Sequence, residues 1–500
     1  MNNILYVKKA LSNLPHNEIN KGKETLFVTL RSFGFILHQE LFMANILARS
    51  GAHVVVLLDD GILNHWDTYQ IHNKGMALNN YGSMKLRLQK AVLLGLYAHK
   101  NITVRYLSEV IKEKHYEKTE ITHSDEMNAV SSTRRYFESG GFNEKSPVEK
   151  QYYDNSIDNI KKVKCAVKAL HEQYSFDSVI TSHGIYSLWG GSYDYFKSIG
   201  VPIYMYGVHV YRDSHIQFSD TIGQTLALDT SWAEFRKKPF SEEQRKRVDD
   251  FFISRRSHTT KDTSIYYSWM KDFESFKVEK GKGSKTFAIF PNIIWDGDVT
   301  QRDTIFNGMF DYLSYTIQFF INHPKDNLII RVHPAEATLY QDTPGVNKLI
   351  HEKYPNIDNI KNIYIIQANQ RVDTYAFAKE NIDAALVYDS ILTLEMTHLG
   401  IPVISPSCSR YTCESFVIVP KTRDEFDAVL TSDMFRDYLN DERMSEFYKY
   451  AYWHLFDAAY IMPFYSTGEY EKLDISKTSL EKMKDPDFLK LIDKIYSIYK

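Results

Sequence analysis

The sequence predicts an α/β protein with two domains, each built on a parallel sheet, and three observations lead to that prediction. Its 500 residues are more than one hydrophobic core normally supports. Short apolar runs alternate with helical segments in both halves of the chain, which is the pattern of β-α-β units. A Gly/Lys-rich run, Gly281–Lys285, separates the two halves and is typical of a hinge or linker.

In the first half, the order of strands and helices begins with a β-α-β unit. The apolar runs Thr25–Leu30 and His53–Leu58 read as strands, and Leu37–Arg49 between them carries a helical stripe of apolar residues. Two later strands are expected at Phe176–Thr181 and Pro202–Tyr206, the second being the last of this half. Between these pairs we expect mostly helix over 66–114, a polar surface insertion over 115–150, and a long amphipathic helix over 152–174.

The second half repeats the pattern with strands at Thr286–Phe290, Leu328–His333 and Ile363–Gln367. Strands at Ala384–Tyr388 and Pro402–Ser405 then flank a short helix, Asp389–Leu399. Asp389 or Ser390 can cap that helix, and Gly400 can take the left-handed conformation that ends it. Its N-terminus then points to the carboxyl edge of the sheet, where open α/β sheets place phosphate-bearing ligands.

The strand Leu328–His333 ends in His333-Pro334-Ala335-Glu336. Proline forces the residue before it out of helical geometry, so the chain turns at His333. A histidine held at the end of a strand can donate to a phosphate oxygen, although the same tetrapeptide can simply end a strand.

Together, the run RVHPAE and the later Ser-x-x-Thr-x-Glu helix with Gly-x-Pro-Val-Ile resemble the nucleotide-binding half of GT-B glycosyltransferases. The likeness is greatest to the bacterial capsule and surface-polysaccharide group, which includes Kdo transferases, HP-motif sialyltransferases and polyol-phosphate transferases. It covers residues 286–420. It implies two Rossmann-like domains that face a central cleft, with C-terminal helices packing back on the first domain.

The resemblance also implies roles for residues of the second half. In the family, the HP histidine contacts the nucleotide phosphate, which corresponds to His333 with Pro334, and hydroxyls at the later helix hold it, which corresponds to Ser390 and Thr393. Glu395 stands where relatives place a carboxylate that holds ribose. The first loop of the second domain lies near the donor in such enzymes, so the remaining donor-contact candidates are Asn292, Trp295 and Asp296.

The general base is expected in the first half, where four candidates follow strands. His183 and His209 come after two successive strands, and Asp213 beside His209 could orient its ring or act as the base itself. Asp60 resembles the acidic-acidic-Gly motif of bacterial sialyltransferases, but Asp-Gly after a strand is also a common turn. The choice among the four stays open. In relatives of the polyol-phosphate type, a histidine placed like His209 serves as the base.

The expected domains are 1–250, an acceptor domain with a helical insertion over about 66–170, and 285–450, a nucleotide-sugar domain. Residues 451–500 are expected to form crossover helices, with Tyr448–Tyr465 packing on the first domain and Leu480–Lys500 at the surface.

Composition narrows the classes of partner. The net charge of −3 gives no global attraction to nucleic acid. The three cysteines do not make a disulfide framework and indicate a reducing cytosol. We expect no signal peptide and no spanning helix, hence a cytoplasmic protein that could meet an acceptor at the inner membrane face. Neither a metal nor a separate cofactor is expected, although Asp296-x-Asp298 looks like a metal-binding pair.

The resemblance implies a glycosyltransferase that moves a sugar from a nucleotide-sugar donor, with CMP, UDP or GDP as the nucleotide, to a surface glycan or lipid-linked glycan. The reaction is expected to be inverting and metal-independent. The alternatives are a nucleotide-sugar epimerase or polyol-phosphate transferase of the same fold, and a non-catalytic protein that binds glycans through its 35 Tyr residues.

Overall fold

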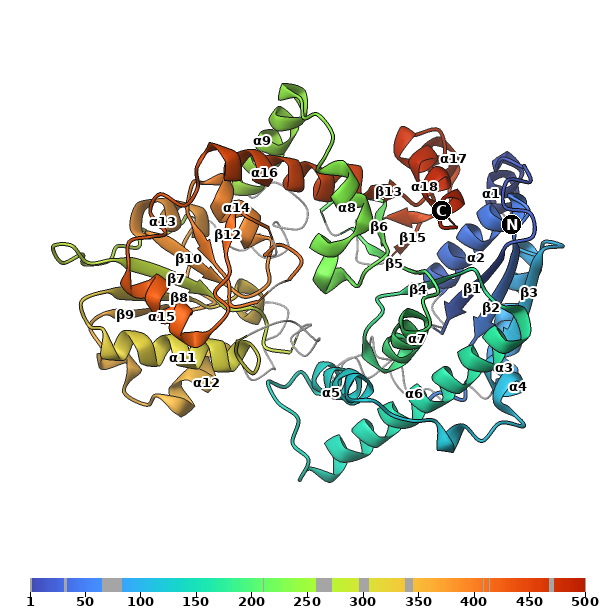
Figure 1. Ribbon diagram of the computed structural model, residues 1–500, viewed down its shortest axis with the longest axis horizontal. Helices are drawn as coiled ribbons and strands as arrows, with labels where there is room; N and C mark the ends of the chain where they lie inside the picture. Colours follow the sequence, from blue (N-terminus) through green and yellow to red (C-terminus); the bar gives the residue numbers. More distant parts are fainter. Residues whose placement is uncertain are drawn as a thin grey trace. The chain divides into compact units, whose positions relative to one another are not determined.

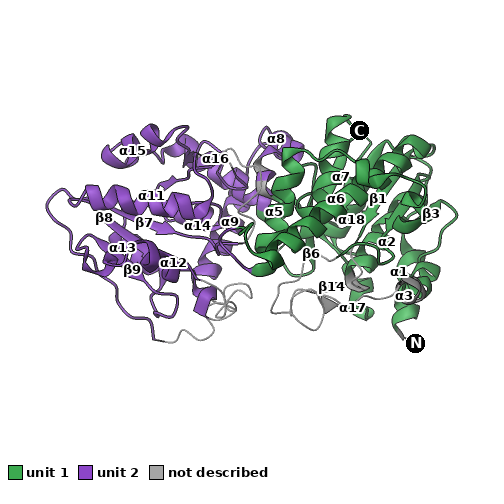
Figure 2. Ribbon diagram, turned by 90° about the horizontal axis from the view of Figure 1, so that it is seen from below, with its two compact units in different colours: residues 1–137, 142–223, 455–500 green, residues 138–141, 224–454 purple. Residues whose placement is uncertain are grey.

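The computed structural model describes residues 2–30, 34–64, 83–209, 211–257, 272–295, 305–337, 345–407, 409–412, 414–466 and 472–499. The chain forms two compact units (Figure 2). Unit 1 comprises residues 1–137, 142–223 and 455–500, and unit 2 comprises 138–141 and 224–454. The predicted fold class is confirmed, because each unit is a Rossmann-like α/β structure built on a largely parallel sheet.

Unit 1 is built on a seven-stranded sheet of order β13-β6-β5-β4-β1-β2-β3. The five strands from β5 to β3 in that order are parallel, whereas β6 and β13 add antiparallel pairs at one edge. The strands are β1 Glu24–Thr29, β2 His53–Leu58, β3 Ile102–Tyr106, β4 Ser178–Ser182, β5 Ile203–Val208, β6 His215–Ser219 and β13 Ala459–Ile461. A separate two-stranded ribbon joins β14 Tyr465–Ser466 to β15 Lys472–Leu473.

Helices cover both faces of this sheet, because alternate residues of each strand belong to different hydrophobic clusters. Phe27 and Val54 pack with α2 and the C-terminal helices, while Leu26 and Val55 pack with α6 and α7. The helices are α1 Asn2–Asn13, α2 Gly34–Arg49, α3 Ser83–Leu96, α4 Leu107–Ile111, α5 His123–Phe137, α6 Pro147–Tyr174, α7 Tyr186–Ser198, α17 Lys477–Lys482 and α18 Pro486–Tyr496 (Figure 1).

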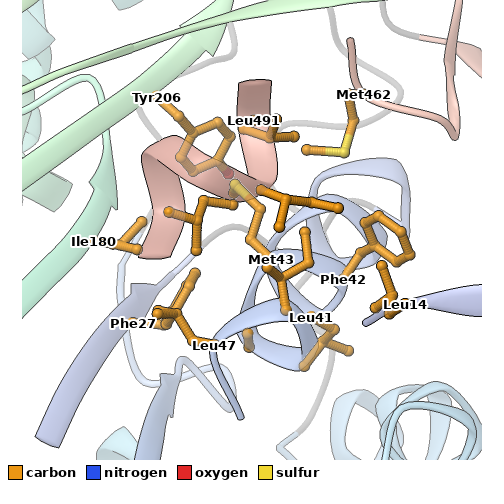
Figure 3. Close-up of a cluster of buried hydrophobic side chains, with 14 of the residues drawn as sticks. Leu14, Phe27, Leu41, Phe42, Met43, Leu47, Ile180, Tyr206, Met462 and Leu491 are labelled. Carbon is orange, nitrogen blue, oxygen red and sulfur yellow. The ribbon is translucent and has the colours of Figure 1, made fainter. Parts of the chain in front are cut away.

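The last helix is part of the core of unit 1. Figure 3 shows Leu491 of α18 and Met462 beside Phe42 and Met43 of α2, with Tyr206 of the sheet nearby. The expected return of C-terminal helices to the first domain is therefore present, but α18 buries an apolar face where a surface helix was expected.

Unit 2 is built on a six-stranded parallel sheet of order β12-β11-β10-β7-β8-β9. The strands are β7 Thr286–Phe290, β8 Asn327–Arg331, β9 Ile363–Ile366, β10 Ala384–Val387, β11 Val403–Ile404 and β12 Val417–Ile418. The helices are α8 Thr230–Phe235, α9 Glu242–Arg256, α11 Met309–Asn322, α12 Val346–Lys353, α13 Thr374–Asn381, α14 Leu392–His398, α15 Arg423–Thr431 and α16 Asp441–Tyr452.

The connecting regions contain elements that were not expected. The described part of the segment predicted as mostly helix holds α3 and α4 but also the strand β3, and the predicted surface insertion contains α5, whose polar residues Asp125, Ser131 and Ser132 are buried. Neither β6 nor β13 was expected, and the aromatic stretch after Tyr448 leaves the helix for β13. The unexpected strands form because they pair with other strands of the sheet. Their apolar runs are too short to predict a strand from the sequence alone.

Residues 224–250, which the sequence places with the first domain, pack within unit 2. The indole Nε1 of Trp232 in α8 donates to Glu414 over 2.7 Å, and Phe252 of α9 lies against His398 and Phe447. These contacts place α8 and most of α9 in unit 2, although the sequence assigned residues up to 250 to the first domain.

Replacement of Leu491 by alanine tests the role of α18 in the core. Leu491 is fully buried, so L491A should lower the free energy of unfolding by about 2–5 kcal/mol. L489A is the matched control, since Leu489 on the same helix is 53% exposed. Urea unfolding of both variants measures the difference, and equal losses would contradict the packing of α18 described above.

Candidate functional site

In unit 2, the strand order reverses between β7 and β10. From β7 the chain builds outward through β8 and β9, and from β10 it builds the other way through β11 and β12. The loops after two such neighbouring strands leave in opposite directions, which opens a crevice at their carboxyl ends where α/β proteins bind ligands. Asn292 follows β7, and Asp389 and Ser390 follow β10, so three residues singled out in the sequence lie at this switch point.

Asn292 links the two sides of the switch point. Its Nδ2 donates to the backbone carbonyl of Asp389 over 2.5 Å. Its Oδ1 is buried and has no hydrogen-bond partner among the described residues, and the same holds for Oγ1 of Thr393 in α14. Buried polar atoms are rarely left in this state, because each loses its hydration without compensation. A polar ligand could supply the missing partners.

The helix after β10 is shorter than expected. It begins at Leu392, and no side chain caps it through the N-cap position, Ile391. The amide of Leu392 donates to Ser390 Oγ over 3.3 Å, and the amide of Thr393 donates to the Ser390 carbonyl over 3.0 Å. Ser390 thus accepts a hydrogen bond from the first turn of the helix, as the sequence predicts. Gly400 does end the helix with the expected positive φ, +76°.

His333 follows β8, the strand next to β7. The backbone amide of Ala335 donates to its Nδ1 over 3.1 Å, so the neutral ring carries its proton on Nε2. Pro334 is buried and begins a short 3-10 turn, Pro334–Ala337, that carries the imidazole at the strand end. The tautomer is the one that a phosphate-binding histidine needs, because Nε2–H is a donor.

Glu336 of the same turn is held against α12. Both of its carboxylate oxygens lie 3.1 Å from the amide of Val346, the first residue of that helix. A Cβ on Gly345 would lie 2.4 Å from the carboxylate, so only glycine allows this approach. Burial raises the pKa of Glu336 to about 7, although the amide of Val346 opposes that shift.

Glu395 and Trp295 have structural partners in unit 2. Glu395 is 3% exposed, and its Oε1 accepts from Arg255 Nε at 2.5 Å and from the Tyr375 hydroxyl at 2.9 Å. This carboxylate ties α9 and α13 to α14, and its predicted contact with ribose stays a prediction. Trp295 is buried in the hydrophobic cluster over the sheet. Asp296 and Asp298 lie outside the described residues.

In unit 1, the strand order reverses between β1 and β4, and His183 directly follows β4. His183 is partly exposed, and its Nδ1 lies 2.5 Å from Ser182 Oγ. Asp60 lies further along the edge, after β2, and is fully buried. Its carboxylate accepts from the Ser108 amide at 3.1 Å and from the Ser108 hydroxyl at 2.6 Å, so it anchors the start of α4.

His209 and Asp213 lie in the loop between β5 and β6. His209 is only 2% exposed, and its amide donates to the His215 carbonyl over 3.0 Å. The carbonyl of Asp213 accepts from Nδ1 of His215 at 2.6 Å, while the Asp213 side chain is exposed. The four base candidates thus follow strands of one parallel sheet edge, and His183 is the one at the switch point.

Sequence reasoning missed His215, which holds this loop to the C-terminal helix. Its Nδ1 lies 2.6 Å from the Asp213 carbonyl and its Nε2 lies 3.2 Å from the Asp487 carboxylate, so the ring bridges the β5–β6 loop and α18. Burial would raise the pKa of Asp487, but hydrogen bonds from His215 and Lys490 and the charge of Arg212 hold it well below its ordinary value. No local motif signals a contact across 272 residues.

Comparisons with known proteins bear on the fold. No family model and no curated protein sequence matches the chain. Among solved structures, it is similar to the β-Kdo 2,7 transferase KpsC of Thermosulfurimonas dismutans, with 11% identity over 64% of this chain and 89% of that one and a TM-score of 0.35. It is also similar to UDP-GlcNAc 2-epimerase of Methanocaldococcus jannaschii, with 8% identity over 94% and 99% of the two chains and a TM-score of 0.29.

A third likeness is to tyrosyl-tRNA synthetase of Leishmania major, with 11% identity over 74% of this chain and 84% of that one and a TM-score of 0.26. The predicted resemblance to capsule Kdo transferases is thus found among the structural neighbours. At these identities and TM-scores, the likenesses carry no argument about activity. None of the described helices has both the length and the apolar composition to cross a lipid bilayer.

Replacement of Glu336 by glutamine tests the burial of that carboxyl. The pKa of Glu336 is higher in the folded protein than in the unfolded chain, where it is about 4.5. Ionisation of this carboxyl therefore lowers the free energy of unfolding as the pH rises above about 4.5, and the full loss is reached above pH 7. E336Q, which cannot ionise, should gain about 1–3 kcal/mol over the wild type at pH 8 and little at pH 4.5.

Urea unfolding at both pH values measures this difference. E352Q on α12 is the control, since Glu352 is 59% exposed. A gain that is the same at pH 4.5 and pH 8 would contradict the raised pKa of Glu336.

Proposed function

We propose that this protein is a glycosyltransferase that binds a nucleotide-sugar through unit 2 and transfers the sugar to a glycan or glycolipid hydroxyl, with inversion and without a metal. The observation that carries the proposal is the set of polar groups at the carboxyl edge of the unit 2 sheet. His333 Nε2–H, the hydroxyls of Ser390 and Thr393 and the amide of Asn292 come from three neighbouring strand ends.

These groups suit a leaving diphosphate or monophosphate. Imidazole and hydroxyl donors placed before the reaction stabilise negative charge as it develops on phosphate oxygens, and they need not reorganise in the transition state. The unpartnered Oγ1 of Thr393 and Oδ1 of Asn292 would gain partners on the nucleotide. Donors of this kind make a metal unnecessary for holding the phosphate.

A carboxylate that accepts from ribose hydroxyls completes such a site. Glu395 was the expected residue, but its Oε1 already accepts from Arg255 and Tyr375. Asp389 stands at the switch point, one residue before Ser390, and its backbone is fixed by Asn292. Asp389 is therefore the better candidate for the ribose contact under this proposal.

In the proposed reaction, an acceptor hydroxyl loses its proton to a general base as its oxygen attacks the anomeric carbon. The bond from that carbon to the phosphate oxygen breaks, and the oxygen keeps the electron pair. One base is enough for an inverting transfer, because the incoming and leaving oxygens occupy opposite faces of the sugar.

Thermal unfolding with CMP, CDP, UDP, GDP and their sugars tests nucleotide binding. A nucleotide at about 100 times its Kd should stabilise the wild type by about 2.7 kcal/mol, seen as a rise in Tm. H333A should bind that nucleotide about tenfold to a hundredfold more weakly, because it loses a hydrogen bond to a charged group worth about 1.5–3 kcal/mol.

H351A is the control, since His351 lies on α12 and contacts Asp358 and a helix carbonyl. If no nucleotide raises Tm, or if H333A binds as the wild type does, the proposed function fails. Turnover of a nucleotide-sugar into an isomer with no acceptor present would favour the epimerase alternative.

A further inference from the structure

Two segments of unit 1 contain no acidic residue. All 63 Asp and Glu residues of the chain lie outside residues 1–17 and 68–108. The chain as a whole has a net charge of −3, so the two segments are positive and the rest of the chain is more negative than the total. Charge segregated in this way is typical of a protein that meets an anionic partner with one part of its surface. The basic residues of the two segments are Lys8, Lys9, Lys74, Lys85, Arg87, Lys90, Lys100 and Arg105.

The two segments form helices that lie next to each other. The first segment contains α1 and the second contains α3, and these two helices contact each other (Figure 2). Val7 and Leu11 of α1 belong to the hydrophobic cluster against which Leu93 and Leu96 of α3 pack. The fold thus brings together two basic segments that are far apart in the sequence.

The outer face of α1 combines apolar and basic side chains. Ile4 is 46% exposed and Leu5 is 64% exposed, and the exposed Lys8 and Lys9 follow one helical turn later. Residues four apart lie on the same side of a helix, so Ile4 is in line with Lys8, and Leu5 is in line with Lys9. The helix therefore presents two aliphatic side chains and two ammonium groups to the solvent on one face, while Val7 lies in the core.

The C-terminal half of α3 is also apolar at the surface. Val92 is 73% exposed, and Leu93 and Leu96 are only partly buried. Single exposed apolar residues are normal, but exposed aliphatic side chains on two helices in contact are the pattern of an interaction surface. The exposed Lys100 follows this helix.

Positive groups gather where the end of α3 meets the residues after α1. Burial lowers the pKa of His99, and the charges of Arg49, Lys100 and His16 lower it further. These four residues come from three separate segments of the chain. The positive charge of this region is therefore a property of the fold and not only of the sequence.

Two acidic residues close to α1 have basic partners of their own. Glu18, which follows α1 in the chain, lies 3.0 Å from the ammonium of Lys21. Glu481 belongs to α17, which contacts α1, and lies 3.9 Å from the ammonium of Lys477. Because each carboxylate is paired in this way, neither offsets the charge of the lysines on the outer face of α1.

We propose that the outer face of α1, together with the C-terminal end of α3, docks unit 1 on an anionic phospholipid bilayer. Lys8, Lys9 and Lys100 contact lipid phosphates, while Leu5 and Val92 enter the boundary between headgroups and acyl chains. A helix with exposed apolar side chains and lysines lies in this boundary, parallel to the membrane surface. The inference does not depend on the proposed function, because the nucleotide site belongs to unit 2.

The same features disfavour two other occupants. A second copy of this chain would bring two positive faces together, and like charges repel. A nucleic acid attracts lysines through its phosphates, but the exposed aliphatic side chains of Ile4, Leu5 and Val92 gain nothing from a phosphate backbone. A bilayer offers both an anionic surface and an apolar interior, so it matches both parts of the face.

Co-sedimentation of the full chain with lipid vesicles tests the docking. Vesicles of about one third phosphatidylglycerol and two thirds phosphatidylcholine should bind the wild type about tenfold or more tightly than vesicles of pure phosphatidylcholine, because the anionic surface attracts each lysine. A salt concentration of about 1 M should remove most of this preference, since the Debye length then falls to about 3 Å.

Two variants separate the charge of the face from its apolar contact. K8Q/K9Q should weaken binding to the anionic vesicles about thirtyfold, which is about fivefold for each lysine, and should change binding to pure phosphatidylcholine little. L5Q should weaken binding to both kinds of vesicle about tenfold, because the leucine no longer enters the acyl-chain boundary.

Unit 2 offers a matched control for each variant. K237Q/K238Q removes the same charge from another exposed pair of lysines, and L228Q replaces a leucine that is 62% exposed. Both controls should bind vesicles as the wild type does. All the substituted side chains are exposed, so the Tm of every variant should equal that of the wild type.

Equal binding to the two kinds of vesicle, or equal losses in K8Q/K9Q and K237Q/K238Q, would overturn the inference. Binding to duplex DNA or RNA that K8Q/K9Q abolishes, in a protein that does not bind vesicles, would assign the face to a nucleic acid and overturn it as well. The rise of Tm with nucleotide is measured separately: its absence would end the proposed function and leave the vesicle result unaffected.

Discussion

The carboxyl edge of each parallel sheet carries most of the candidate residues, and the reversal of strand order singles out His183 in unit 1 and Asn292, Asp389 and Ser390 in unit 2. In a parallel sheet all carboxyl ends lie along one edge, and the loops part only where the order reverses. In unit 2 that point lies between β7 and β10, where Asn292 bridges to the carbonyl of Asp389. In unit 1 it lies between β1 and β4, where His183 follows the strand. The chemistry therefore depends on topology before it depends on any one side chain.

The strain around His183 shows what holds a site of this kind together. The turn after β4, which holds His183 and Tyr186 in left-handed conformations, would relax if its amides were solvated. Instead, the amide of Tyr186 donates to Asn128 and the amide of Ser187 donates to Ser132. Burial of Asn128 and Ser132 is compensated because each accepts a hydrogen bond from an amide of α7. The glycines of α7 contribute by having no side chain, which lets the helices approach.

Much of the fold could be predicted from the sequence, because period-2 and period-3.6 apolar patterns are local. The bounds of β2 and β7 agree with the apolar runs His53–Leu58 and Thr286–Phe290. The edge strands β3 and β13, and β6 beside β13, could not be predicted. Their apolar runs are short, and β13 pairs with a strand that lies on the other side of unit 2 in the chain. For the site, the HP turn indicated His333 and its strand end, and the residue pattern indicated Ser390 as a cap of α14. The bond from Asn292 to the Asp389 carbonyl joins strand ends 97 residues apart, and no local pattern shows it.

The chain order adds a constraint on how the sites form. Unit 2 is inserted between residues 223 and 455 of unit 1, so β13 pairs with β6, and Asp487 reaches His215, only after the whole of unit 2 has been traversed. Closing so long a loop costs entropy that grows with the logarithm of its length, and a folded unit 2 shortens the effective loop. The sheet edge beside the His209 loop is thus completed by segments that follow unit 2 in the chain, namely β13 and α18.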